Sequence, residues 1–125
     1  NIQFDKILLD VPCSGLGVLR KKPEKIYDLT NEQIKLLKKL QKTIFDSGYK
    51  ALKSGGILVY STCTFTKNEN TNNVKSFLEK YDDLEMMEVL VPENVNVTKD
   101  EFGGVYINYK NMYLDGFYIA KFKKK

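Results

Sequence analysis

Apolar and polar positions alternate along the chain in blocks that predict strands and helices in turn. Residues 4–10 form a short apolar run, and a loop rich in Pro, Ser and Gly follows it directly. Residues 57–62 form a second apolar run rich in β-branched side chains, again followed by small polar residues. Runs of this length and composition are typical of buried strands that end in loops.

Two further stretches have the periodicity of amphipathic helices. The first covers residues 30–53 and has lysines opposite its apolar face. Thr30 and Gln33 have the spacing of a capping box, which satisfies unpaired amide groups at a helix start. Thr66 and Glu69 repeat this spacing, so we expect the second helix to begin there.

The remainder of the chain contains three more predicted strands. Residues 84–90 form an apolar run that Pro92 stops, and residues 105–109 and 116–122 form two further apolar runs. Residues 92–104 have no convincing period and are expected to be a loop. The order strand, helix, strand, helix and then strands predicts an α/β sheet that is parallel at first and antiparallel at its end.

Length and composition narrow the classes of function. The chain has 125 residues, enough for one domain, and no run approaches the ~20 apolar residues of a membrane span, so we expect no membrane partner. It has no histidine, which excludes Ser-His-Asp, Cys-His and histidine-metal chemistry within the chain. Two cysteines alone do not make a thiolate zinc site, so we expect no metal. The net charge of +4 permits a polyanionic partner.

Three side chains capable of chemistry follow the first two predicted strands. Asp10 and Cys13 come at the end of the first strand, and Cys63 comes at the end of the second. Ligands of an open parallel sheet bind at the carboxyl ends of its strands, so neighbouring strands would bring two thiols and a carboxylate into one crevice. The alternative is that both cysteines are small apolar core residues, which is a common role of free cysteine. Position alone leaves both interpretations open.

The segments around the two cysteines resemble the motifs of a known family. They are Asp10-Val11-Pro12-Cys13-Ser14-Gly15-Leu16-Gly17 and Ser61-Thr62-Cys63-Thr64-Phe65, with Glu69-Asn70 shortly after. This pair resembles the RNA cytosine-C5 methyltransferases of the RsmB/Nol1/Nop2/Sun family, and the resemblance covers nearly all 125 residues. It implies the second half of a Rossmann-like methyltransferase sheet, with S-adenosylmethionine as cofactor and RNA as partner.

The resemblance also implies a role for each site residue. Cys63 would be the thiolate nucleophile that adds to C6 of cytosine, which makes C5 nucleophilic enough to attack the methyl group of S-adenosylmethionine. Cys13 would help to remove the C5 proton or to break down the adduct. Asp10 would lie beside the cofactor and the target base. The expected product is 5-methylcytosine, in ribosomal RNA rather than transfer RNA, made in the cytoplasm.

A basic cluster follows the first site loop. Its members are Arg20, Lys21, Lys22 and Lys25. These side chains could contact RNA phosphates, or they could belong to an ordinary solvated loop. The sequence leaves both interpretations open.

One part of the family's pattern is missing from this chain. The family binds S-adenosylmethionine mainly through a glycine-rich loop and acidic residues after earlier strands, none of which is evident here. We therefore expect residues 1–125 to be a single partial catalytic domain, from the fourth strand to the last. Alone it should be inactive, and it should either self-associate through its unpaired edge or be only marginally stable. The alternative function is a non-catalytic RNA-binding module with a degenerate methyltransferase fold.

Overall fold

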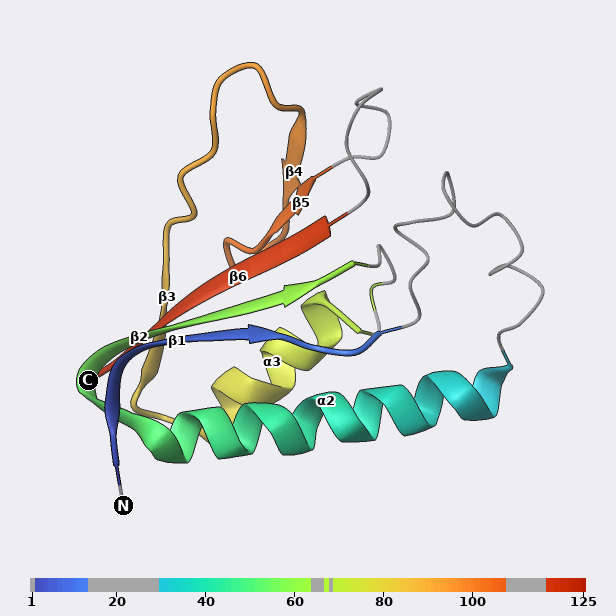
Figure 1. The fold of residues 1–125 in the computed structure, drawn as a ribbon. Helices are drawn as coiled ribbons and strands as arrows, with labels where there is room; N and C mark the ends of the chain where they lie inside the picture. Colours follow the sequence, from blue (N-terminus) through green and yellow to red (C-terminus); the bar gives the residue numbers. More distant parts are fainter. Residues whose placement is uncertain (1, 14–29, 64–66, 68, 108–116) are drawn as a thin grey trace.

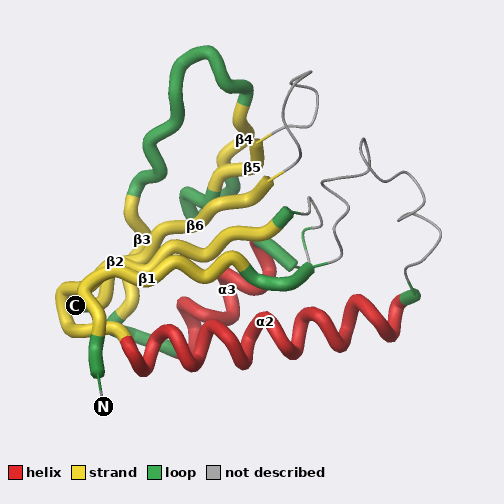
Figure 2. Tube along the Cα trace, viewed as in Figure 1, coloured by secondary structure: helices red, strands yellow, loops and turns green. Residues whose placement is uncertain are grey.

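The described part of the chain folds as an α/β unit in which two helices pack on one side of a sheet (Figures 1 and 2). The computed structural model describes residues 2–13, 30–63, 67, 69–107 and 117–125. The elements in chain order are β1 (Phe4–Asp10), α2 (Asn31–Ala51), β2 (Leu52–Thr62), α3 (Thr71–Lys80), β3 (Leu84–Met87), β4 (Val97–Lys99), β5 (Val105–Ile107) and β6 (Phe117–Lys124).

The strands of the described residues form one sheet in the order β1-β2-β6-β5-β4, and β3 pairs with β6 beside that path. The β1 and β2 strands are parallel. Strand β6 is antiparallel to β2, β3 and β5, and β4 is antiparallel to β5. The prediction of an α/β sheet that begins parallel and ends antiparallel is therefore confirmed.

Side chains alternate along β1 and β2, and this gives the sheet one covered face and one uncovered face. Leu9 pairs with Tyr60 in the parallel register, and Leu8 pairs with Val59. Tyr60 is fully buried and Leu9 packs against the same core, whereas Leu8 is 68% exposed. The described helices therefore cover one face of the sheet, and apolar side chains remain accessible on the other.

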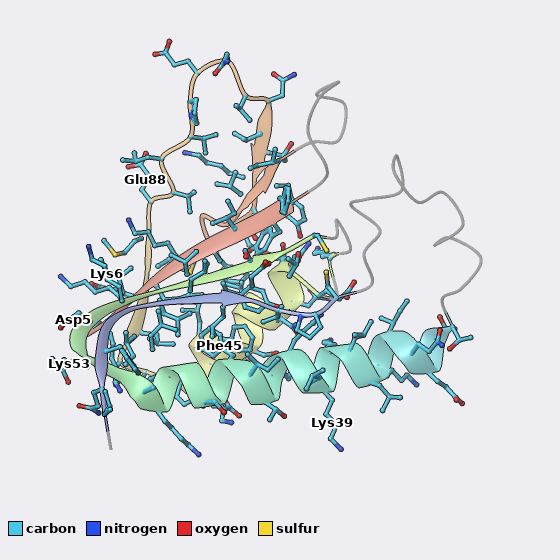
Figure 3. All side chains as sticks on the ribbon, in the orientation of Figure 1. Asp5, Lys6, Lys39, Phe45, Lys53 and Glu88 are labelled. Atoms are coloured by element: carbon cyan, nitrogen blue, oxygen red, sulfur yellow. The ribbon has the colours of Figure 1, made fainter. Side chains whose placement is uncertain are left out.

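Helix α2 begins where the capping box predicts. The Thr30 hydroxyl accepts a hydrogen bond from the Gln33 backbone N–H at 3.1 Å, and the Gln33 side-chain oxygen accepts one from the Thr30 N–H at 2.9 Å. Figure 3 shows Phe45 directed toward the sheet and Lys39 directed away from it, as the predicted amphipathic pattern requires. The buried residues of the helix are Gln41, Phe45 and Gly48.

Strand β2 follows helix α2 without a connecting loop, because it begins at Leu52 and not at Ile57 as predicted. Gly56 makes this early start possible. A Cβ atom there would lie 2.8 Å from the Lys53 carbonyl oxygen and 2.9 Å from the Asp5 carbonyl oxygen. Such close backbone approach admits only glycine.

The predicted start of the second helix is wrong. Helix α3 begins at Thr71, directly after Asn70. The Asn70 side-chain oxygen accepts a hydrogen bond from the Thr62 hydroxyl at 2.6 Å. Thr66 lies outside the described residues. Glu69 is turned into the interior, where its carboxylate accepts a hydrogen bond from Gln41 at 3.2 Å. This partner belongs to helix α2.

Two predictions for the second half of the sheet also need correction. The third strand ends at Met87 rather than at residue 90, because only four of its residues pair with β6. Leu90 beyond it is 84% exposed. Residues 97–99, expected to belong to a loop, form the short strand β4 by pairing with β5. Residues 108–116, part of which was predicted as strand, lie outside the described residues.

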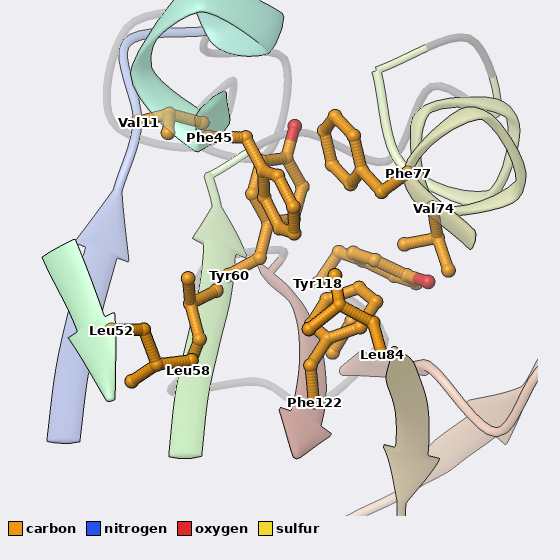
Figure 4. Close-up of a cluster of buried hydrophobic side chains, with 11 residues drawn as sticks. Val11, Phe45, Leu52, Leu58, Tyr60, Val74, Phe77, Leu84, Tyr118 and Phe122 are labelled. Carbon is orange, nitrogen blue, oxygen red and sulfur yellow. The ribbon is translucent and has the colours of Figure 1, made fainter. Parts of the chain in front are cut away.

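Aromatic rings join the two helices to the sheet (Figure 4). The Phe45 ring of α2 stacks on the Phe77 ring of α3, with centroids 3.7 Å apart and planes 6° apart. The Phe122 ring of β6 meets Phe45 edge-on at 5.2 Å, and the Tyr60 ring of β2 does so at 6.2 Å. Phe45 is completely buried, so it is the ring through which α2 is packed onto both neighbours.

We expect Phe45→Ala to lower the free energy of unfolding by about 3–5 kcal/mol, because it removes a buried ring and leaves a cavity among its partners. Lys39→Ala, on the opposite and exposed side of the same helix, should change it by less than about 0.5 kcal/mol. Chemical denaturation of the two variants measures both values. Equal effects would contradict this assignment of the core.

Candidate active site

The parallel strands β1 and β2 bring the two cysteines into contact where the strands end. The Cys13 and Cys63 sulfur atoms are 3.0 Å apart and are not covalently linked. The Cys63 backbone N–H also donates to the Cys13 sulfur, at 3.2 Å. Both side chains are half-buried, so each thiol keeps some access to the surface. The two thiols therefore form one site, as their places after neighbouring strands predict.

The environment of Cys63 favours its thiolate form. The hydrogen bond from Cys13 is the largest influence, and it lowers the pKa of Cys63 from 9.0 to about 7. Burial opposes this effect, and the nearby negative charges of Asp10 and Glu69 oppose it further. A substantial fraction of Cys63 is therefore ionised near neutral pH, and the thiolate is the nucleophilic form of cysteine.

Asp10 lies beside the thiol pair on the last position of β1. It is exposed, and its carboxylate accepts a hydrogen bond from the Ser61 hydroxyl of β2 at 3.1 Å. The register places Asp10 on the same face of the strand as Leu8, which is the face that the described helices leave uncovered. The carboxylate is therefore available to a ligand that approaches from this side.

A cluster of buried polar side chains lies beneath the cysteine loops. Gln41, Glu69 and Asn73 are fully buried, and they hydrogen-bond to one another and to the hydroxyl of Tyr60. Sequence reasoning missed this cluster: it gave Glu69 only as part of a capping box, and it did not single out Gln41, which lies in the apolar stripe of the helix predicted over residues 30–53. The available signal was an amide side chain in the centre of that stripe, since buried polar groups need partners.

The structure does not describe all of the residues that were predicted to belong to the site. Arg20, Lys21, Lys22 and Lys25 lie outside the described residues. Among the residues that the structure does describe, no group of three potential metal ligands occurs. Within the same residues, no helix is long and apolar enough to span a membrane.

Comparison with known protein families shows which family contains this chain and its two cysteines. The chain matches the family model described as 16S rRNA methyltransferase RsmB/F over residues 1–123, a range that includes Asp10 and both cysteines. The chain belongs to the RsmB/F family. Membership confirms the resemblance that the two cysteine motifs indicate.

Curated members of the RsmB/F family match almost the whole chain. Ribosomal RNA small subunit methyltransferase B of Escherichia fergusonii is 40% identical over 123 residues, covering 98% of this chain and 27% of the relative. Ribosomal RNA small subunit methyltransferase F of Vibrio cholerae is 37% identical over 125 residues, covering 98% of this chain and 26% of the relative. The chain thus spans about a quarter of the length of these relatives.

Solved structures confirm the Rossmann-like methyltransferase fold. NSun6 from Pyrococcus horikoshii, determined with SFG, is similar with a TM-score of 0.83 and 32% identity. The similarity covers 98% of this chain and 30% of that one. A methyltransferase homologue from the same organism has a TM-score of 0.80 and 32% identity, over 100% of this chain and 40% of its own.

The pKa of Cys63 is open to direct measurement in this RsmB/F-family chain. Alkylation of Cys63, followed on its own peptide by mass spectrometry, should accelerate with rising pH about a midpoint near 7, because only the thiolate reacts. Cys13→Ala removes the hydrogen bond to Cys63, so the midpoint should rise toward 9.0 and the rate at pH 7 should fall several-fold.

Asp10→Asn is a control that should shift the pKa of Cys63 in the opposite direction. It removes a nearby negative charge and should lower the midpoint of Cys63. A profile that stays unchanged in Cys13→Ala would refute the assignment of Cys13 as the main cause of the lowered pKa.

Proposed function

We propose that this chain is part of a protein that transfers a methyl group from S-adenosylmethionine to C5 of cytosine in ribosomal RNA, acting in the cytoplasm. The observation that carries the proposal is the contact of two thiols, one of them readily ionised, in a member of the RsmB/F family. The relatives from Escherichia fergusonii and Vibrio cholerae are named as ribosomal RNA small subunit methyltransferases, which supports ribosomal RNA as the substrate.

Cys63 begins the reaction in this proposal. Its thiolate donates an electron pair to C6 of cytosine, a C–S bond forms, and the electrons of the C5–C6 double bond move toward N3. The carbon at C5 then has the nucleophilic character of an enamine, which free cytosine lacks. The low pKa of Cys63 supports this role, because a useful fraction of thiolate exists at neutral pH without a histidine base.

Cys13 acts at the end of the reaction. After C5 has gained its methyl group, the C5 proton must leave, the C5–C6 double bond must re-form, and the C–S bond must break to return the Cys63 thiolate. The Cys13 sulfur lies 3.0 Å from the Cys63 sulfur, which supports a role in assisting the departure of Cys63; once Cys13 has given up its own proton, its thiolate can also accept the C5 proton.

Asp10 is the residue of this chain that suits the cofactor. S-adenosylmethionine supplies the electrophilic methyl group when it is bound, and its sulfonium and amino groups are positively charged. The exposed Asp10 carboxylate on the uncovered face suits such a cation or a ring nitrogen of the base. SFG, an analogue of S-adenosylmethionine, is present in the related NSun6 structure, which supports the same cofactor class here.

The basic cluster is proposed to contact the RNA backbone. Arg20, Lys21, Lys22 and Lys25 follow Cys13 closely in the sequence, and four cations so close together in the sequence would attract phosphates. The target base must leave any helical stack for Cys63 to reach C6, so contacts to the flanking phosphates would help to hold the opened strand.

The uncovered sheet face supports a partial catalytic domain. Leu8 is 68% exposed, Phe4 is 51% exposed, and in the described residues the β1 strand pairs only with β2. The chain covers 27% of its relative from Escherichia fergusonii. We therefore propose that the rest of the protein covers this face and pairs with the free edge of β1, completing the cofactor site.

The isolated 125-residue chain should form no 5-methylcytosine with S-adenosylmethionine and RNA, and it should self-associate in size-exclusion chromatography with light scattering. Leu8→Lys places a charge on the uncovered face and should reduce the association. Leu90→Lys alters a leucine that is 84% exposed but lies beyond β3, and it should have little effect. A monomeric, active chain would contradict the proposal of a partial domain.

The reaction class is tested with the full-length protein, S-adenosylmethionine and RNA that carries 5-fluorocytidine. Fluorine at C5 prevents the final proton removal, so the adduct should persist through denaturation. We expect the adduct in the wild type and in Cys13→Ala, and its loss in Cys63→Ala. A wild type that binds RNA without forming an adduct would favour the non-catalytic RNA-binding module instead.

A further inference from the structure

The buried side chain of Gln41 stands out within α2 because it is a fully buried amide in a stripe of otherwise apolar or small residues. It lies one helical turn before Phe45, whose ring packs between α3 and the sheet. Its backbone is therefore held in place by the core. A buried amide needs hydrogen-bond partners, so the partners of Gln41 indicate its role.

The amide of Gln41 reaches both cysteine loops. Its Nε2 donates to the Pro12 carbonyl oxygen at 2.9 Å, and Pro12 is the residue directly before Cys13. The same nitrogen donates to the Glu69 carboxylate at 3.2 Å, in the segment that follows Cys63. A reversed amide would set its oxygen against both acceptors, so these partners fix the orientation of the side chain.

The other end of the amide connects to β2, the strand that Cys63 follows. Gln41 Oε1 accepts a hydrogen bond from Asn73 Nδ2 at 2.9 Å, and this nitrogen also lies 3.2 Å from the Tyr60 hydroxyl. The Tyr60 hydroxyl donates in turn to the Glu69 carbonyl oxygen at 2.8 Å. One continuous chain of contacts therefore runs from Pro12 through α2 and α3 to β2.

We infer that Gln41 is a positioning residue whose amide holds the Cys13 loop against the end of β2, which Cys63 follows, and so keeps the two sulfur atoms in contact. Its hydrogen bonds within the described residues go to Pro12, Glu69 and Asn73 and not to either sulfur. Its effect passes through Pro12 on one side and through Asn73 and Tyr60 on the other. This inference rests on the proposed function, and it adds a residue that neither cysteine motif contains.

The principal test is Gln41→Met in the full-length protein, because methionine keeps the length of the side chain and removes both polar atoms. We expect the alkylation midpoint of Cys63 to rise and its rate at pH 7 to fall about threefold or more, since Cys13 loses its position. We also expect kcat for RNA methylation to fall about tenfold or more while KM for RNA changes less than about twofold.

Two further variants keep the test decisive. Gln41→Glu retains the shape of the side chain but sets a carboxylate against Glu69 and the Pro12 carbonyl, so it should shift both readouts in the same direction even if Gln41→Met fails to fold. Tyr49→Phe is the matched control, because it removes a hydrogen bond to the Asp83 carboxylate at 2.7 Å near the other end of α2. It should lower the thermal midpoint and leave the Cys63 profile and kcat unchanged.

The outcomes separate this inference from the proposed function. A folded Gln41 variant with lower thermal stability but unchanged Cys63 midpoint and kcat would overturn the inference, because Gln41 would then be structural only. The alkylation readout does not require methylation. A wild type without methyltransferase activity would therefore refute the proposed function, while a shifted Cys63 profile in Gln41→Met would still support the positioning role.

Discussion

The parallel pairing of β1 with β2 is the interaction on which the site depends. It aligns Asp10 with Ser61, and the Val11 N–H donates to the Ser61 carbonyl oxygen at 3.1 Å, so the pairing continues to the point where both strands end. A slip of one residue would turn every side chain of β1 to the other face of the sheet. The contact between Cys13 and Cys63 therefore depends on this register.

The interior below the sheet divides into an aromatic part and a polar part. Phe45, Phe77 and Phe122 pack the helices onto the centre of the sheet without polar contacts. Gln41 and Asn73, near the ends of the two parallel strands, replace apolar packing with directional hydrogen bonds. Such bonds favour one arrangement over similar ones, which suits a site whose two sulfur atoms must stay close.

The sequence was sufficient for the elements with strong local signals. The capping box at Thr30 and the periodicity after it predicted α2, and the two apolar runs predicted β1 and the core of β2. The meeting of the cysteines was also predictable, because the carboxyl ends of neighbouring parallel strands lie at one edge of a sheet. Family membership, inferred from the cysteine motifs, was confirmed by the comparisons.

Features that depend on distant partners were not predictable in this way. Glu69 has a capping spacing, yet its carboxylate accepts from Gln41, which is 28 positions away in the sequence. Strand β4 has no convincing pattern of its own and exists because β5 pairs with it. The early start of β2 depends on the close approach of β1 at Gly56, which no local rule reveals. In each case tertiary contacts override the local preference.

The central claim is that the β1–β2 register brings the two thiols into contact, and thiol oxidation tests this contact directly. The full-length protein would be treated briefly with diamide, digested without reduction, and mapped by mass spectrometry. Sulfur atoms 3.0 Å apart should form an intramolecular disulfide between Cys13 and Cys63 faster than either cysteine forms mixed products. Independent modification of the two cysteines, with no peptide pair joined through them, would contradict the account.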